Sequence, residues 1–93
     1  MNTAEKIFHN LLPTFQGRKY ISASMDIDLE KYLCSKLHCI YAGDPYKMGS
    51  LWEFQDGSVL RSINGKVERF STMANAMEGV TLVPRKFLER TKG

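Results

Sequence analysis

The chain has 93 residues, of which 43% are hydrophobic and 25% charged, a balance typical of one small globular domain that excludes a disordered tail. We therefore expect residues 1–93 to form a single compact α+β domain. The formal net charge of +3 excludes a strongly acidic nucleic-acid mimic. A charge of this size permits contact with phosphate or with an acidic protein but does not require either.

No segment of the sequence predicts a membrane span or a secretion signal. No apolar run approaches the roughly 18 residues that cross a bilayer. The first residues, MNTAEKIFHNLLP, carry Glu5 and His9 within their apolar stretch and lack a basic start. We therefore expect a cytoplasmic protein without membrane contact. Cys34 and Cys39 agree with this location, because a helical spacing of five residues keeps two thiols about 7.5 Å apart along the axis and favours the reduced state.

The first predicted helix runs from Thr3 to about Leu12. Asn2 or Thr3 can cap its start, and Pro13 ends it because proline disfavours helical backbone in the residue before it. Its buried stripe is predicted to be Ile7, Phe8, Leu11 and Leu12. Residues 16–24 then read as a connector or a short extended piece.

The second helix is predicted from residue 27 or 28 to Tyr41. Apolar residues recur there at helical spacing and form a stripe of Leu29, Leu33, Leu37 and Ile40. Gly43 would supply the left-handed backbone that commonly follows a last helical turn, and Asp44-Pro45 would begin a β-turn.

Residues 51–71 predict a three-stranded antiparallel meander. Their three strand-like runs are separated by Asp56-Gly57 and Asn64-Gly65, pairs that tolerate the positive φ angles of type I′ hairpin turns. With two-residue turns, Gln55 faces Ser58 and Ile63 faces Lys66. Two rows then align across the strands, namely Phe54, Val59 and Phe70, and Trp52, Arg61 and Glu68.

This register predicts a core face and an outer face. The core face would carry Trp52, Phe54, Val59, Ile63 and Phe70, and the outer face would carry Leu51, Glu53, Leu60, Ser62, Val67 and Arg69. The two amphipathic helices would cover the first face. Arg61 would lie between Trp52 and Glu68 as a cation–π and ion-pair partner.

The predicted fold class is therefore α+β, with two N-terminal helices packed on one face of a three-stranded antiparallel meander. A short helix capped by Ser71 and ending at Gly79 would follow, and Val80–Val83 would form a fourth, edge strand closed by Pro84.

The sequence offers no complete catalytic or metal motif. Cys34 and His38 share a helix face at a spacing of four residues, but a structural zinc site needs four ligands. Asp26 and Asp28 stand before a predicted helix, where aspartates commonly cap backbone amides. We therefore predict no catalytic residue, no metal and no cofactor.

The segment from Tyr41 to Gly49 is the first candidate for binding a partner protein. It joins two tyrosines and a methionine to glycines and a proline, and tyrosines on a stiff turn offer a large contact area at low entropic cost. The candidate contact residues are Tyr41, Asp44, Tyr46, Lys47 and Met48. The alternative is that both rings close the open end of the core.

Two further surfaces are candidates. If helices cover one sheet face only, an exposed apolar strip would remain, formed by Leu51, Leu60 and Val67 with Arg69 at its border. The C-terminal segment could instead fold over this strip. Basic residues at two places could contact a nucleic-acid backbone or an acidic partner: Arg18, Lys19, Arg85, Lys86 and Arg90.

These observations favour a small non-catalytic protein-binding module. In its size and its lack of a catalytic constellation the chain is similar to small proteins that phages and mobile elements encode against host machinery. That resemblance implies an inhibitor or adaptor acting on a host protein complex, such as an anti-CRISPR-like or other anti-defence role. An RNA- or DNA-backbone-binding protein is the alternative, an uncharacterised enzyme is the third, and a homodimer is compatible with each.

Overall fold

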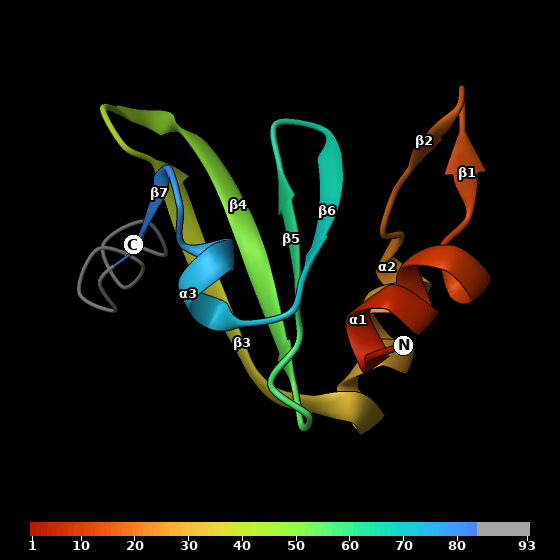
Figure 1. Cartoon of the computed structure of the whole chain (residues 1–93). Coiled ribbons are helices and arrows are strands. Elements are labelled where there is room, and N and C mark those ends of the chain that lie inside the picture. The colour runs from red at the N-terminus through yellow and green to blue at the C-terminus, as the bar shows by residue number, and fades with distance from the viewer. Residues whose placement is uncertain (84–93) are drawn as a thin grey trace.

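The computed structural model describes residues 1–83, which form a small α+β fold around one five-stranded antiparallel sheet (Figure 1). Its strand order is β6-β5-β4-β3-β7. The strands are β3 (Leu33–Tyr41), β4 (Asp44–Phe54), β5 (Val59–Ile63), β6 (Lys66–Phe70) and β7 (Val80–Leu82). Consecutive hairpins join β3 to β6, and β7 then returns to the far edge of the sheet to pair with β3. Within residues 1–83, no helix is long and apolar enough to cross a membrane.

The prediction of a second helix up to Tyr41 is wrong. A helix is present earlier, as α2 (Ala23–Leu29), and it passes through the single 3-10 turn η2 (Glu30–Tyr32) into β3. In β3 the odd-numbered residues lie toward the core, so Leu33 and Leu37 satisfy the two-residue period of a strand as well as a helical stripe. Pairing with the long strand β4 decides between the two, and Gly43 lies in the tight turn between them.

The start and end of the first helix are confirmed. It comprises α1 (Thr3–Lys6) and the wider π-helical turn η1 (Ile7–Leu11), and Leu12 before Pro13 is extended. The Asn2 side chain caps it by accepting the Glu5 N–H at 2.9 Å. The wider turn places the Leu12 N–H on the Ile7 carbonyl and leaves Leu11, predicted to be buried, 50% exposed.

Residues of the loop between β4 and β5 also cap this helix. The Thr3 N–H donates to Asp56 Oδ2 at 2.8 Å, and the Ala4 N–H donates to Ser58 Oγ at 3.0 Å. These contacts satisfy amides that have no partner within the helix. They fix the N-terminal segment against the sheet at a point more than fifty residues away in sequence.

The meander is present, but only one of its two turns has the predicted register. Ile63 pairs with Lys66 as predicted, because both Asn64 and Gly65 adopt positive φ. At Asp56-Gly57 only Gly57 does, with φ +88°, and the loop is one residue longer. The Phe54 N–H therefore donates to the carbonyl of Ser58.

That single-residue shift redistributes the side chains of β4 relative to β5. Trp52 faces Leu60 instead of Arg61, and Glu53 faces Val59. The predicted core face is therefore wrong, because Trp52 and Phe54 do not share a face with Val59.

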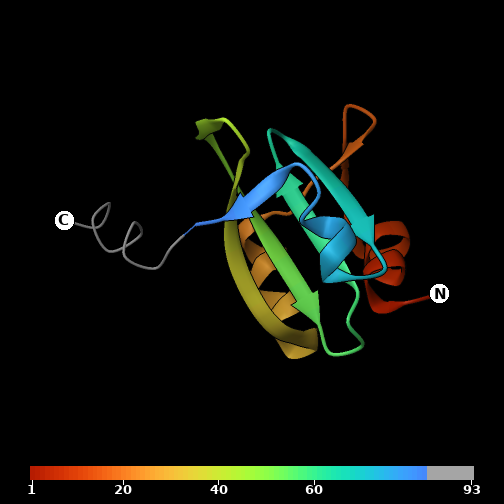
Figure 2. The same ribbon diagram turned by 60° about the vertical axis from the view of Figure 1, so that its left-hand side comes forward.

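Both faces of the sheet are covered, so the predicted arrangement of two helices on one face of a three-stranded meander is wrong. One face packs against the N-terminal segment through the cluster Ala4, Ile7, Leu12, Leu29, Trp52, Phe54, Leu60 and Val67. The other packs against the short helix α3 (Met73–Ala76) and β7 through Cys39, Leu51, Val59, Ile63, Ala76 and Val80. Figure 2 shows α3 on one side of the sheet and α2 on the other.

The short helix and the C-terminal strand are present close to where the sequence placed them. Thr72, one residue after the predicted cap Ser71, accepts the Asn75 N–H at the start of α3. The strand at Val80–Leu82 lies at an edge, as predicted, but beside β3 rather than beside the meander. It is thus the fifth strand of the sheet, since residues 33–41 supply a strand that the prediction lacked.

Arg61 fixes α3 to the sheet. It pairs with Glu68 at 3.2 Å, as predicted, but its ring partner is Phe70, 4.7 Å from the guanidinium, rather than Trp52. Its Nη1 donates to the carbonyl oxygens of Ala76 and Glu78, both at 2.9 Å. An arginine thus satisfies carbonyl groups at the C-terminal end of α3.

Candidate functional site

Three hairpin ends lie at the same end of the molecule, at the top of both Figure 1 and Figure 2. They are the turn between β3 and β4, the turn between β5 and β6, and a separate small hairpin of β1 (Thr14–Phe15) and β2 (Arg18–Lys19). The predicted partner-binding segment and one predicted basic pair are therefore brought to one end by the fold.

The end of the β3–β4 hairpin carries an irregularity that presents Tyr46. Tyr41 pairs with Asp44, but the preceding residue of β3, Ile40, pairs with Met48. The intervening residues 45–47 have no partner on β3 and form a bulge, which re-aims side chains away from a sheet. The Tyr46 side chain is 94% exposed, the most exposed of the large hydrophobic side chains within residues 1–83.

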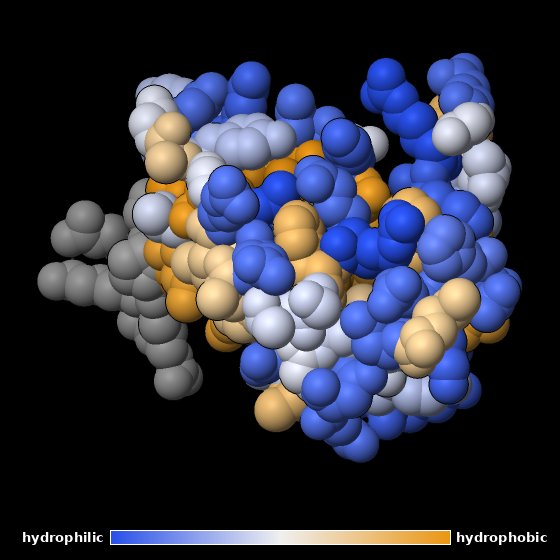
Figure 3. Space-filling view, viewed as in Figure 1, coloured by the Kyte–Doolittle hydropathy of each residue, from blue (hydrophilic) through white to orange (hydrophobic). Residues whose placement is uncertain are grey.

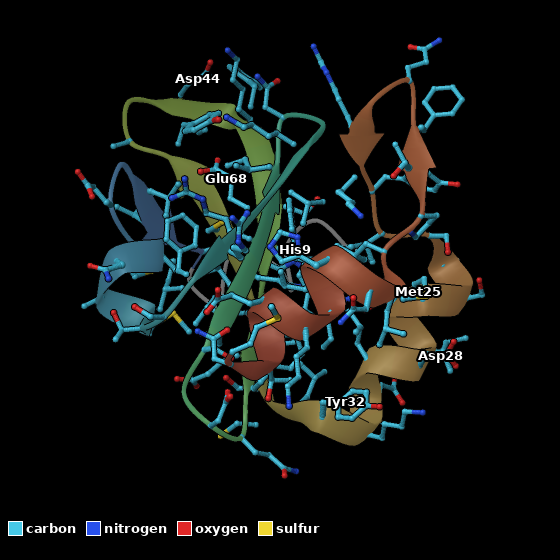
Figure 4. All side chains as sticks on the ribbon, turned by 45° about the vertical axis from the view of Figure 1, so that its right-hand side comes forward. His9, Met25, Asp28, Tyr32, Asp44 and Glu68 are labelled. Atoms are coloured by element: carbon cyan, nitrogen blue, oxygen red, sulfur yellow. The ribbon has the colours of Figure 1, made fainter. Side chains whose placement is uncertain are left out.

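Local contacts hold this bulge in place. Asp44, labelled at the end of the hairpin in Figure 4, accepts the Tyr46 N–H at 3.2 Å, which forms an Asx-type turn. The Lys47 ammonium lies 4.0 Å from Asp44 Oδ2 and 5.9 Å from the centroid of the Tyr41 ring. The charges of the tip thus pair with one another, and the exposed surface is made by Tyr46 and the 43% exposed Met48. We call residues 41–48 the hairpin tip.

The alternative, that both tyrosine rings close the open end of the core, holds for Tyr41 but not for Tyr46. Tyr41 packs against the buried cluster beneath α3, so this ring does close the core. Tyr46 contributes nothing to that cluster.

The β1–β2 hairpin stands apart from the sheet, and Figure 3 shows a hollow between it and the body of the molecule with hydrophilic side chains at the rim. A groove of about 400 Å³ lies there. It is lined by Phe15, Gln16, Arg18, Lys19, Tyr20 and Gly65, and we call it the hairpin groove. Phe15 is 63% and Tyr20 40% exposed, and their rings meet edge to face with centroids 6.1 Å apart.

A second groove of about 500 Å³ lies along the edge strand β6. Residues of β6 from Lys66 to Phe70 form one wall, and Asn2, Glu5 and Phe8 form the other. The Phe8 ring lies beneath two cations, Lys19 at 5.7 Å and Arg69 at 4.6 Å from its centroid. The fold therefore brings the basic pair of β2 next to Arg69 of β6.

Two predicted sites remain, the C-terminal basic residues and the apolar strip on the sheet. Arg85, Lys86 and Arg90 lie outside the described residues. Leu51 and Leu60 are fully buried and Val67 is 7% exposed, so the structure has no apolar strip there and these side chains belong to the core. The α3 segment covers Leu51, as the alternative reading of that surface expected, whereas the N-terminal segment covers Leu60 and Val67.

Cys34 and His38 lie on β3 rather than on a helix, where a spacing of four residues separates them by about 13 Å. Within residues 1–83 there is no group of three or more His, Cys, Asp or Glu side chains that could hold a metal ion. Cys34 is exposed and Cys39 buried on the other side of the strand.

The titratable groups with shifted pKa values belong to structural contacts. Asp26 accepts Trp52 Nε1 at 2.8 Å and Lys36 Nζ at 2.6 Å. Burial raises the pKa of the Asp26 carboxyl. The hydrogen bonds from Lys36 and Trp52 lower the pKa and together outweigh burial, so the net shift is downward. The hydroxyl of Ser58 holds the pKa of Asp56 well below its usual range, with help from the Thr3 amide.

Sequence reasoning missed the aromatic half of the hairpin groove, because residues 16–24 read as a connector. The available signal was Gln16-Gly17 between Phe15 and Arg18, a glycine-containing turn flanked by short extended pieces. Gln16 has φ 49° and so lies in the left-handed region that such a tight turn requires.

The chain matches no protein-family model, no curated protein and no solved structure. Its function is therefore inferred from its own surfaces.

Proposed function

We propose that the protein is a non-catalytic module that binds a partner protein through the hairpin tip. One observation carries the proposal: Tyr46 is 94% exposed while hydrogen bonding at its own backbone holds it on a bulge. A large aromatic side chain in this setting contributes little to the core, and tyrosine is among the residues enriched at energetic hot spots of interfaces.

The charge of the tip fits a protein better than a polyanion. Asp44 and Lys47 lie 4.0 Å apart and compensate each other, so the tip presents no excess of one sign. Aromatic and methionine side chains are enriched at protein interfaces, whereas charged residues are depleted in their centres. Tyr46 and Met48 would form the centre of the contact, and Asp44 and Lys47 its polar rim.

The module would act in the cytoplasm as an inhibitor or adaptor on a host protein complex. Cys34 and Cys39 are both free thiols, which agrees with a reducing compartment. The proposed role needs no chemistry from the chain itself, only occupation of a partner surface.

The test is affinity capture from nuclease-treated lysate of the source or host cells, with the wild type, Tyr46→Ala and Phe15→Ala as baits. Phe15→Ala is a matched control, because it also removes an exposed aromatic side chain from the end of a hairpin. Loss of a hot-spot side chain costs about 2 kcal/mol or more, a loss of affinity of roughly 30-fold. We expect Tyr46→Ala to lose a protein that the wild type and Phe15→Ala both retain.

The same variants should fold equally well. Substitution of an exposed side chain changes the free energy of unfolding by about 0.5 kcal/mol or less. Retention of every captured protein by folded Tyr46→Ala would contradict the proposal, as would its unfolding under conditions in which the wild type is stable.

A further inference from the structure

We infer that the hairpin groove binds single-stranded nucleic acid, with a base stacked on the exposed aromatic rings of Phe15 and Tyr20 and a phosphate held by Arg18 on the same face. This site is separate from the hairpin tip and does not depend on the function proposed for it.

The geometry of the small hairpin displays a ring beside a cation. Phe15 pairs with Arg18, and paired residues of an antiparallel ladder lie on the same face. Tyr20 lies on that face too, two residues after Arg18, and its N–H donates to the carbonyl of Pro13 at 3.3 Å. One face therefore carries two aromatic rings and a guanidinium, while Lys19 lies on the other face and reaches the Phe8 ring.

The exposure of these rings has no structural explanation within residues 1–83. Phe15 is 63% exposed and Tyr20 40%, and neither is a member of the two buried clusters. The hairpin contacts the sheet through β2 and β6 rather than through these two rings, so the rings remain available to a ligand. Rings that meet edge to face at 6.1 Å leave ring surface open on which a planar base can stack.

The charge around the groove selects an anionic ligand. No acidic side chain lines the hairpin groove, and Lys66 follows its wall residue Gly65. Across residues 1–83, Arg18, Lys19, Lys66 and Arg69 form no ion pair, whereas Lys36, Lys47 and Arg61 do. These four cations lie on β2 and β6, and Lys19 and Arg69 lie 5.7 and 4.6 Å from the centroid of the same ring, that of Phe8.

The two grooves differ in their acidic side chains, because none lines the hairpin groove whereas Glu5 and Glu68 line the groove along β6. Glu5 lies there on the N-terminal segment. Glu68 lies on the other face of the strand from Arg69 and is neutralised by Arg61. Glu5 therefore limits the anion-binding site to the hairpin end of the molecule.

Aromatic rings combined with unpaired cations favour a single strand over the alternatives. A duplex offers phosphates, but its bases are stacked on one another and their faces are closed to protein rings. An acidic peptide would satisfy the cations and leave the two rings without a planar partner. Stacking on aromatic side chains with phosphate contacts is the usual mode of sequence-tolerant binding to single strands.

The test is fluorescence anisotropy with a labelled single-stranded oligonucleotide of about twelve nucleotides, as DNA and as RNA. The affinities of two other labelled ligands, the same sequence as a duplex and a poly-glutamate of similar length, are measured in the same way for comparison. We expect the wild type to bind the single strand more tightly than the duplex or poly-glutamate. Affinity should fall with added salt, because bound phosphates release counterions.

Paired variants separate the stacking contribution from general charge. Phe15→Ala should weaken single-strand binding about tenfold, and Phe15→Trp should retain it, because stacking depends on the ring face. Tyr46→Ala removes an exposed ring from the other hairpin and should leave the affinity unchanged.

Arg18→Gln should weaken binding and reduce the slope of log affinity against log salt by about one. Lys31→Gln removes an equal charge from the exposed turn η2, outside the groove, and should do neither.

Equal weakening by Lys31→Gln and Arg18→Gln would overturn the site, because binding would then reflect net charge alone. Duplex binding as tight as single-strand binding with unchanged affinity in Phe15→Ala would also overturn it, as would tighter binding of poly-glutamate. Circular dichroism should show all variants folded. Should Phe15→Ala unfold, Phe15→Leu keeps apolar bulk without a ring, and retained affinity in that variant would refute stacking.

Discussion

Arg61→Met should strongly destabilise the contact between α3 and the sheet. Arg61 is 8% exposed and donates to the carbonyl oxygens of Ala76 and Glu78 and to the Glu68 carboxylate. Methionine keeps most of the apolar stem but leaves both carbonyl groups without this donor. Each hydrogen bond from a charged group contributes about 1.5–3 kcal/mol, and relief from burying the guanidinium offsets part of that loss. The expected net loss in the free energy of unfolding is therefore about 3 kcal/mol.

Urea denaturation measures this loss, and amide hydrogen exchange locates it. The Val80 and Ala42 amides, which donate to the Met77 and Gly79 carbonyl oxygens, should exchange faster in the variant, because both bonds depend on the placement of α3. Arg69→Met is the matched control, since Arg69 is an exposed arginine on the neighbouring strand and loses only a cation–π contact with Phe8, at a cost of about 0.5–1 kcal/mol. A loss below about 1 kcal/mol with unchanged exchange would refute the role assigned to Arg61.

Three further predictions concern stability and reactivity. Gly49→Ala should lower the free energy of unfolding, measured by urea denaturation, by about 2–3 kcal/mol, because the added Cβ would lie 2.6 Å from the Cβ of Ile63 and push β4 away from β5. A loss below about 0.5 kcal/mol would contradict this prediction. Folding lowers the pKa of Asp56 from its ordinary 3.8, so the wild type should melt at a higher temperature than Asp56→Asn above about pH 4. This difference in melting temperature should disappear as the pH falls further, and a difference that does not change with pH would contradict the prediction. Cys34 should react with a thiol reagent in the folded protein, whereas Cys39, which is fully buried and whose pKa burial raises, should react only after unfolding.

Features that depend on a few adjacent residues could be predicted from the sequence. Asn2 caps the first helix through its own side chain, and Pro13 fixes an extended conformation at Leu12. The turn at Asn64-Gly65 sets the register of β5 against β6, because both residues adopt positive φ within the turn itself. The bulge that exposes Tyr46 also arises locally and is stabilised by Asp44, but the sequence left open whether this ring closes the core.

Features that depend on a distant partner could not be predicted. Residues 33–41 carry apolar side chains at positions that fit both a helix and a strand, and only pairing with β4 selects the strand. At Asp56-Gly57 the loop closes one residue later than a type I′ turn would. There Asp56 and Ser58 also bind the amides of Thr3 and Ala4.

The candidate binding surfaces divide in the same way. Arg18 and Lys19 are recognisable as a basic pair in the sequence, but their proximity to Arg69 exists only because β2 packs beside β6 over the Phe8 ring. The burial of Leu51 likewise depends on the return of the chain through α3 and β7 across the second sheet face. The Asn2 cap, the helix end at Pro13 and the Asn64-Gly65 turn were thus determined by the sequence itself, since their energies arise within a few residues. The choice of strand over helix, the sheet register and the grouping of cations were decided by tertiary structure, since contacts between distant segments stabilise them.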